Sequence, residues 1–313
     1  MRTQAGYFFL SGLRVQYTKP PLSINDQLGL LVQRGMLVPD VDQARHYLSH
    51  VNYYRLRGYW LPFEDASGAG AHRFRVGTTF DDVVSLYVFD RHLKLLLMDL
   101  IERTEVSLRT QWAYQLSMRH GAHAHLVSSL YTSLTVYNKC LASLEEEIKR
   151  SHETFIKHYS TKYRQPPSPP LWAVCEVLSL GQLSRWLENL KHRGDRQAIA
   201  AIYGLDEKVL CSFLHHLSHV RNLCAHHSRV WNRRFTFTMK IPSRPPALSS
   251  GFNPAADRQI YNTFVMLGHL ISIVSPGSSW RRDLLALLSG CPHAQPDKMG
   301  FPSGWQTLPV WAT

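Results

Sequence analysis

Apolar residues recur at intervals of three and four along most of the chain, and few stretches alternate with a period of two. This pattern predicts helices, and we therefore expect an all-α protein. The first predicted helix begins after Ser23, a residue type that caps helices, and ends near Gly35. The second begins at Asp40 or Asp42 and continues through VNYYRLRGYWLPF as far as Pro62.

A loop is predicted in DASGAGAHRFRVGTTF, with a short strand or extended piece at 72–76. Thr79 and Asp82 then have the spacing of a capping box, which opens an apolar-periodic run to about Met118. A helix of about forty residues would be roughly 60 Å long at 1.5 Å per residue. We therefore expect a bend or a break within it.

Shorter helices are predicted beyond this run, and the chain ends in a polar tail rich in glycine and proline. The predicted helices cover 134–163, the stretch from Ser168 and Pro169 to an interruption at Gly181, 196–202, 206–227 and 257–273. This organisation suggests an N-terminal helical region at 1–75, a helical core at 76–280, and a C-terminal tail at 281–313 packed on the core.

The composition is that of a globular protein, with 44% hydrophobic and 19% charged residues among 313. No run of 18 apolar residues is present, and the first residues lack a long apolar run and a cleavage site, so we expect a cytoplasmic protein without membrane contact. The five cysteines are odd in number and scattered, which argues against a disulfide framework.

The charge is strongly positive, with a formal net charge of +12 and a pI near 9.6. Such a chain attracts polyanions, because each neutralised phosphate releases counterions. Nucleic acid is therefore the expected partner, although a basic protein without any such partner would have the same charge.

The helix predicted at 206–227 has two distinct faces. At 100° per residue, its apolar side consists of Val209, Leu210, Phe213, Leu214, Leu217, Val220 and Leu223. The opposite side carries His215, His219, Asn222 and His226 at i, i+4, i+7 and i+11. A solvated face is usually built from lysine and glutamate. This histidine stripe is therefore either a functional surface or an ordinary exposed one.

The spacing Arg221-x4-His226, with Asn222 beside the arginine, favours the functional interpretation. Histidine exchanges a proton near neutral pH, and arginine holds phosphate oxygens in a bidentate fork. Cleavage of RNA by its own 2′-hydroxyl needs these two roles. The two side chains lie about 140° apart on one helix. The length of Arg221 spans that gap, or two copies of the helix meet around one phosphate in a symmetric dimer.

The segment RNLCAHHSRVWNR resembles the RNxxxH signature of HEPN ribonucleases, and more narrowly that of the Abi abortive-infection proteins of the AbiD and AbiF type. Four further segments resemble the same family in the same order. They are HYLSHVNYYRLRGYWLPF, FDDVVSLYVFDRHLKLLLMDLIERTEVSLRTQ, PPLWAVCEVLSLGQLS and MGFPSGWQTLPVW. Together the five segments cover the chain from about 22 to 311.

The resemblance implies an all-α, HEPN-type helical bundle with additional N-terminal helices and a short irregular C-terminal tail. It implies a homodimer formed through the motif helix and metal-independent cleavage of RNA that leaves a cyclic phosphate. It also implies a role in defence against phage, as an abortive-infection effector or a toxin of the toxin–antitoxin kind. Some relatives are associated with a small structured RNA, which would be a second RNA partner.

The resemblance also assigns roles to residues of the motif. Arg221 would bind the scissile phosphate, His226 would act as acid or base, and Asn222 would orient the site or hold the partner helix. His227, Arg229, Trp231 and Asn232 follow the Abi pattern as well. Arg229 would contact RNA, and Trp231 would belong to the core or to an interface.

Two other clusters are candidates for supporting roles. HEPN proteins often place a polar residue of another helix against the motif, and Glu105 or Arg109 would be that residue; the alternative is an exposed i, i+4 ion pair. Arg55 and Arg57 are candidates for contacts with RNA. The aromatic rings around them either stack on bases or pack in the core: Tyr53, Tyr54, Tyr59 and Trp60.

A zinc site is not expected. His215 and His219 lie one turn apart, but His226 is about 10 Å further along the axis, and no carboxylate or CxxC completes a ligand set. No phosphate-binding glycine loop and no GxSxG elbow occurs, so no cofactor is expected either. Two other functions remain open, a noncatalytic RNA-binding or regulatory module for a cognate small RNA or partner protein, and transfer of a nucleotide to a target.

Overall fold

The computed structural model of the chain describes residue 16, residues 18–65 and residues 72–311. Over these residues the chain forms thirteen α-helices, several 3-10 turns and no β-strand. The prediction of an all-α protein is therefore confirmed. Among the described helices, none combines the length and the apolar character needed to span a membrane.

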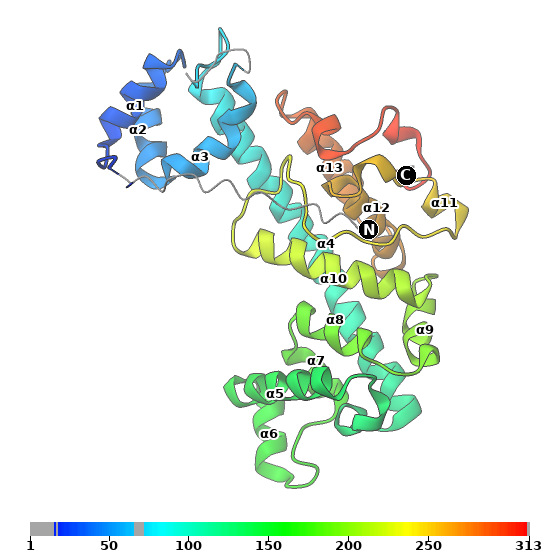
Figure 1. Ribbon diagram of the computed structural model, residues 1–313. Helices are drawn as coiled ribbons and strands as arrows, with labels where there is room; N and C mark the ends of the chain where they lie inside the picture. Colours follow the sequence, from blue (N-terminus) through cyan, green and yellow to red (C-terminus); the bar gives the residue numbers. More distant parts are fainter. Residues whose placement is uncertain (1–15, 17, 66–71, 312–313) are drawn as a thin grey trace, which may run out of the picture. The chain divides into compact units, whose positions relative to one another are not determined.

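The chain divides into two compact units, one that ends at Val84 and one that starts at Ser85. The first unit contains α1 (Ile24–Gln33), α2 (Val41–His50) and α3 (Tyr53–Trp60), which Figure 1 shows in blue. Ser23 caps α1 in a reciprocal capping box, and Asp40 caps α2, as their positions in the sequence predict.

The second predicted helix is in fact two, α2 and α3. Val51 is extended, and the side chain of Asn52 accepts the backbone N–H of Tyr54 at 2.8 Å, which starts a new helix. The piece predicted to be extended at 72–76 forms one antiparallel bridge between Glu64 and Phe74 and no longer strand. Residues 66–71 of the predicted loop lie outside the described residues.

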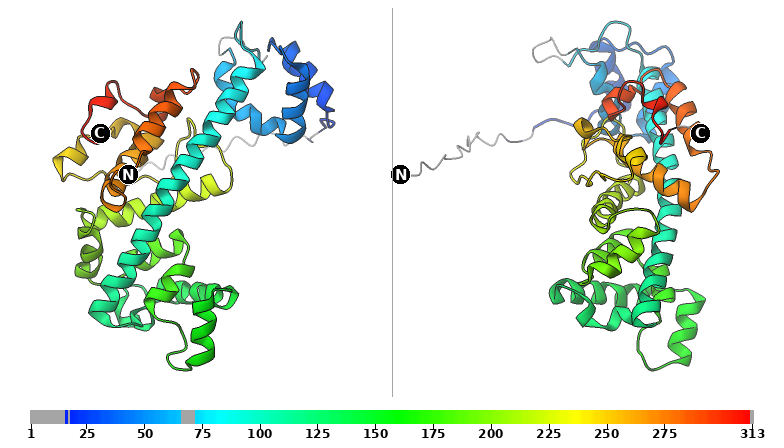
Figure 2. Two further views of the ribbon diagram at one scale, coloured as in Figure 1. Left: turned by 180° about the vertical axis from the view of Figure 1, so that it is seen from behind. Right: turned by 90° about the vertical axis from the view of Figure 1, so that its right-hand side faces the viewer.

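Helix α4 (Phe80–His120) is the longest of the described elements, and the break that was one of the two expectations for it does not occur (Figure 2). Its capping box is present, since Thr79 N–H donates to Asp82 at 2.8 Å and Asp82 N–H donates to the Thr79 hydroxyl at 3.1 Å. Buried apolar residues recur from Leu86 to Leu116. Packing along this whole length supports one continuous helix.

The remaining helices all belong to the second unit. They are α5 (Leu134–Arg150), α6 (Thr154–Lys162), α7 (Leu171–Val177), α8 (Leu180–Glu188), α9 (Arg193–Ala201), α10 (Glu207–Ala225), α11 (Pro246–Ser249), α12 (Ile260–Val274) and α13 (Trp280–Ser289). The single helix predicted at 134–163 is interrupted at Ser151–Glu153, which separates α5 from α6. The helix predicted from Ser168 and Pro169 begins later, at Leu171.

Helix α12 forms the centre of the C-terminal part, because it is buried on nearly all sides. Gly268 lets α13 approach closely, since a Cβ at this position would lie 2.5 Å from the ring of Trp280. Helix α13 occupies the start of the region predicted as an irregular tail. The tail therefore contributes a packed helix to the second unit.

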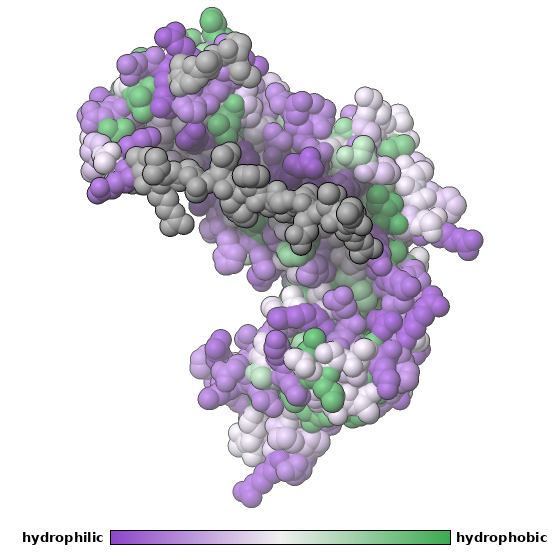
Figure 3. Space-filling model, viewed as in Figure 1, coloured by the Kyte–Doolittle hydropathy of each residue, from purple (hydrophilic) through white to green (hydrophobic). Residues whose placement is uncertain are grey.

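The face drawn in Figure 3 is mainly hydrophilic, and the hydrophobic residues on it form small separate patches among polar ones. This distribution agrees with the globular composition of the chain.

Candidate active site

Helix α10 carries the predicted motif. Its N-terminal cap is Asp206, whose carboxylate accepts the backbone N–H of Lys208 at 2.9 Å. This hydrogen bond is the main reason that the pKa of Asp206 is lowered. The helix packs against α8 and α9 (Figure 1). The residues predicted for its inner face are all buried: Val209, Leu210, Phe213, Leu214, Leu217, Val220 and Leu223.

The helix ends within the motif. The last helical residue is Ala225, so the helix predicted to reach His227 is slightly shorter. His226 is the C-cap residue, and its backbone N–H donates to the carbonyl of Asn222 at 2.9 Å. His227 then adopts a left-handed conformation with φ of 55°. The motif thus lies at the junction between a helix and a tight turn.

The side chains of the motif are accessible. Asn222 and His226 are exposed and Arg221 is half-buried. Over residues 72–311, neither the Arg221 guanidinium nor the His226 ring takes part in a hydrogen bond or an ion pair. Both groups can therefore bind an anionic ligand without first breaking an internal contact.

Asp90 of α4 fixes the turn that follows the motif, and the sequence analysis missed it. One carboxylate oxygen accepts the backbone N–H of Val230 at 3.0 Å and of Trp231 at 2.6 Å. The other oxygen pairs with Lys94 at 2.9 Å, and both charged side chains are buried. An aspartate and a lysine at i, i+4 within an apolar run were the available signal.

Arg229 and Trp231, two of the four residues after the motif that resemble the Abi pattern, have different environments. Trp231 is fully buried, and its indole N–H donates to the carbonyl of Ala294 at 2.6 Å, so it belongs to the core. Arg229 is half-buried, with its guanidinium 5.9 Å from the centre of the Trp231 ring. Cation–π contact at this distance holds the arginine beside the end of α10.

A second residue missed by the sequence analysis is His216, which lies on the buried side of α10. Its Nδ1 is 2.7 Å from the carbonyl of Phe237, and its Nε2 is 2.8 Å from the hydroxyl of Thr263. Burial lowers the pKa of His216 to about 4, so the ring is neutral at pH 7. Through these two contacts, His216 of α10 holds the segment around Phe237, which follows the motif, and also contacts α12.

The ring of Phe237 lies against the histidine stripe. Its centroid is 4.6 Å from that of His215 and 5.2 Å from that of His219, edge to face in both cases. His215 is exposed, whereas His219 is half-buried. Burial, followed by the charge of Arg233 and then that of His215, lowers the pKa of His219. The stripe is therefore a mixed surface of imidazoles and one aromatic ring.

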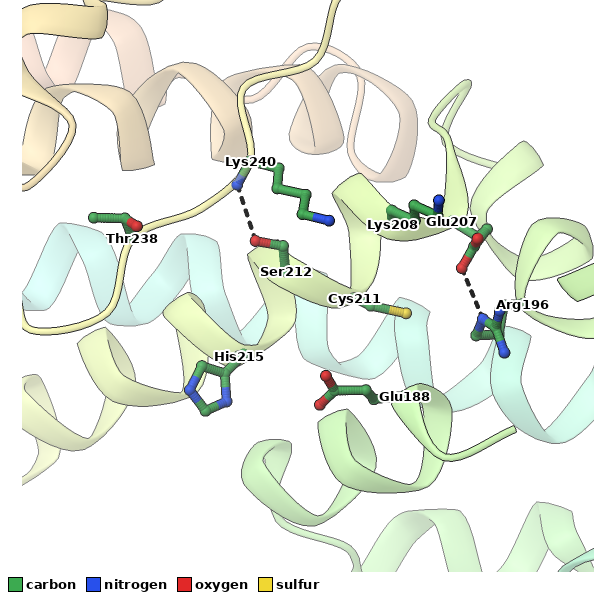
Figure 4. A pocket seen from close by; sticks show the side chains of 9 residues that line it. All are labelled: Glu188, Arg196, Glu207, Lys208, Cys211, Ser212, His215, Thr238 and Lys240. Carbon is green, nitrogen blue, oxygen red and sulfur yellow. Dashed lines mark hydrogen bonds and ion pairs between the residues drawn. The ribbon is translucent and has the colours of Figure 1, made fainter. Parts of the chain in front are cut away.

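A hollow of about 410 Å³ adjoins this stripe at the N-terminal half of α10. Figure 4 shows Lys240 and Thr238 on the segment that crosses α10, Glu188 from α8, and Arg196 from α9. Arg196 is bound to the buried carboxylate of Glu207 at 2.7 Å. The lysines at the edge, Lys208 and Lys240, are exposed cations that suit a phosphate.

Glu105 and Arg109 form the predicted i, i+4 ion pair in α4. Arg109 also donates to the carbonyls of Glu176 and Leu178, at the corner between α7 and α8. Glu105 is buried and Arg109 is largely so. These hydrogen bonds stabilise the corner between α7 and α8, and none of them involves a residue of the motif.

Arg55 and Arg57 lie on α3 in the first unit, where Arg55 is exposed and Arg57 half-buried. The aromatic residues around them divide between core and surface. Trp60 is fully buried in this unit, whereas Tyr54 is exposed. Packing in the core therefore explains the position of Trp60 but not that of Tyr54.

The chemistry offered by the site is that of a guanidinium, an imidazole and an amide at one helix end. In the described residues, no group of three or more histidine, cysteine, aspartate or glutamate side chains could hold a metal ion. Burial raises the pKa of Cys211 and of Cys224 to about 12, so these nearby thiols are neutral.

One comparison with known proteins identifies a family. A family described as Abi-like protein matches residues 46–232, which is more than half of the chain and includes α10 and the motif. No curated protein and no solved structure matches.

Proposed function

The chain belongs to the family of Abi-like proteins, which indicates an abortive-infection function, and we propose that it acts in the cytoplasm as a metal-independent endoribonuclease of the HEPN type. The observation that carries the proposal is that half-buried Arg221 and exposed His226 both lie at the C-terminal end of α10. Both side chains lack an internal partner within residues 72–311.

In the proposed reaction, the His226 ring removes the proton from a ribose 2′-hydroxyl. The 2′-oxygen attacks the adjacent phosphorus, and the bond from phosphorus to the 5′-oxygen breaks. The products are a 2′,3′-cyclic phosphate and a 5′-hydroxyl, whose proton comes from an imidazolium. General acid–base catalysis of this kind contributes about 10²- to 10⁴-fold.

Arg221 and Asn222 have complementary roles in this proposal. The Arg221 guanidinium donates to the non-bridging phosphate oxygens as negative charge builds on them. The carbonyl of Asn222 already holds the backbone N–H of His226. The exposed amide of Asn222 then orients the ribose or the phosphate.

A homodimer through α10 completes the proposed site. Two motif helices related by twofold symmetry would place two guanidiniums and two imidazoles around one phosphodiester. One imidazole then serves as the base and the other, already protonated, as the acid. The stripe of His215, His219 and Asn222 would adjoin this interface.

The strong positive charge supports RNA as the substrate. Arg229 and His227 lie beside the motif, Lys208 lies in the first turn of α10, and Lys240 lies on the segment that crosses α10 at the hollow. These side chains would contact the RNA backbone on either side of the cleaved bond. Arg55 and Arg57 of the first unit would add to RNA binding.

The experiment is incubation of single-stranded RNA with purified protein in EDTA, followed by analysis of the fragment ends. We expect cleavage with a cyclic phosphate by the wild type, and none by His226→Ala or Arg221→Ala. His152→Ala and Arg282→Ala change exposed residues far along the chain from the motif, and we expect them to cleave normally. Equal cleavage by all five proteins would disprove the proposal. RNA binding without cleavage by the wild type would instead identify a noncatalytic module.

A further inference from the structure

A second hollow, of about 620 Å³, lies between α6 and the start of α7. It is lined by none of the motif residues, and its size falls in the range of about 300–1,000 Å³ typical of ligand pockets. Three large aromatic side chains line it while remaining open to solvent: Phe155 is 38% exposed, Tyr163 46% and Trp172 59%. Aromatic surface of this extent is usually buried unless a ligand uses it.

The walls of this aromatic hollow are held in place by hydrogen bonds. The Tyr159 hydroxyl donates to the carbonyl of Pro166 at 2.8 Å and lies 3.3 Å from the Nε2 of His123. The proline-rich wall is fixed at its base by buried His125 and Ser168, 2.9 Å apart. A ligand would thus enter a preformed space, which reduces the entropy lost on binding.

The charges around the aromatic hollow favour an anionic ligand. Helix α6 and the residue pair after it carry Lys157, Lys162 and Arg164, all exposed, and no carboxylate occurs between 154 and 164. The Lys162 ammonium lies 5.4 Å from the centre of the Tyr163 ring. Lys162 therefore lies directly beside the aromatic surface, and Lys157 and Arg164 are neighbours in sequence of the lining residues His158, Tyr163 and Gln165.

The lining also offers polar groups that suit the edge of a base. The amide of Gln165, the ring of His158 and the carboxylate of Glu176 all line the hollow. Amides and carboxylates accept hydrogen bonds from the ring and exocyclic N–H groups of nucleobases, and aromatic rings stack on their faces. A nucleotide combines the three features that suit this hollow: a flat ring, hydrogen-bonding edges and a phosphate.

We propose that the aromatic hollow binds a nucleotide, with its base on Trp172 and Tyr163 and its phosphate on the cations of α6. The nucleotide is either an unpaired residue of an RNA or a free mononucleotide. Binding of an unpaired RNA residue rests on the function proposed for the motif, whereas binding of a free mononucleotide does not.

The test uses His226→Ala protein, so that RNA stays intact. Anisotropy of a labelled, unstructured oligoribonucleotide measures affinity for RNA, and tryptophan fluorescence measures binding of AMP, GMP, CMP and UMP. Because stacking of one base on an aromatic residue contributes substantially, we expect Trp172→Ala in the anisotropy assay, and Tyr163→Ala in both assays, to weaken binding about tenfold. A response to mononucleotides identifies a free nucleotide, and a response to the oligonucleotide alone identifies RNA.

Two further variants serve as controls. Trp172→Phe keeps a ring for stacking but removes the reporter, so we expect it to retain affinity in the anisotropy assay and lose the fluorescence response. Tyr114→Ala removes an aromatic side chain of α4 that is 56% exposed and does not line the hollow, and we expect it to bind as the parent does. Unchanged binding by Trp172→Ala and Tyr163→Ala would overturn the proposal, as would an equal fluorescence response to inorganic polyphosphate.

The outcome separates this inference from the function proposed for the motif. If wild-type protein cleaves RNA through His226 but the Trp172 and Tyr163 variants bind normally, the nucleotide site is refuted and the nuclease stands. If the wild type does not cleave but binds mononucleotides in a way that depends on Tyr163, the nuclease is refuted and the nucleotide site stands.

Discussion

The buried carboxylate of Asp90 accepts the backbone N–H of Trp231 at 2.6 Å, across 141 positions of sequence. The same carboxylate also receives Val230 N–H and the ammonium of Lys94. Because Trp231 follows His226 by only one tight turn, this contact determines where the motif ends in space. The long helix α4 thereby positions the end of α10.

Asp90→Ala is expected to destabilise the protein by about 3–5 kcal/mol, because it leaves the buried Lys94 ammonium and two backbone N–H groups unpaired. Urea unfolding measures this change. Asp99→Ala is the matched control, since Asp99 forms an i, i+4 pair with Arg103 in the same helix but is much more exposed. We expect the control to lose less than about 1 kcal/mol. Equal losses by both variants would show that Asp90 has no special role.

Features set by neighbouring residues were predictable from the sequence. The caps at Ser23, Asp206 and Thr79 depend on residues two or three positions away, and the inner face of α10 depends on the helical period alone. Short interruptions between helices were harder to predict from the sequence. Ser151–Glu153 carries no glycine or proline, so nothing in its composition signals that α5 ends there.

Features set by distant contacts could not be predicted. The helical period places His216 on the inner face of α10, but its hydrogen-bond partner Thr263 lies 47 positions further along the chain and could not be foreseen. Helix α13 lies in a segment that reads as the start of a polar tail. Its buried residues Trp280, Leu284 and Leu288 recur every four positions, which is a helical signal, whereas the approach of Trp280 to Gly268 could not be foreseen.

The burial of His216 predicts a loss of stability in mild acid. Its pKa is about 4 in the folded protein, whereas an unfolded histidine titrates near 6.5. The unfolded state therefore binds more protons between these values, and the free energy of unfolding falls as the pH falls from about 6.5 to about 4. Between pH 7 and pH 5 this residue accounts for about 2 kcal/mol.

Urea unfolding of His216→Gln at both pH values checks this contribution. The glutamine does not titrate, so we expect the variant to lose less stability than the wild type between pH 7 and pH 5. His152→Gln replaces an exposed histidine and should keep the wild-type pH dependence. A variant with the same pH dependence as the wild type would show that His216 is not the titrating group.

Lys208 and Lys240 are expected to contribute to RNA binding mainly through charge. Each phosphate contact to single-stranded nucleic acid adds about 0.7 to the slope of log affinity against log salt concentration. Lys208→Ala and Lys240→Ala, made in His226→Ala protein, should each reduce the slope by about that amount. Lys149→Ala removes an exposed lysine of α5 that does not line the hollow, and its slope should not change. If none of the three lysine variants changes the slope, the RNA does not bind at this hollow.

Mixing wild-type protein with His226→Ala tests whether one site needs both subunits. If one phosphodiester lies between two imidazoles, a heterodimer lacks either the base or the acid and does not cleave. Random pairing of equal amounts leaves one quarter of the dimers fully wild type, so the mixture should keep about one quarter of the cleavage shown by the same total amount of wild type. If each chain cleaved with its own Arg221 and His226, the mixture would keep about one half. Retention of one half although the subunits exchange, as followed by a fluorescent label, would therefore assign a complete site to each chain.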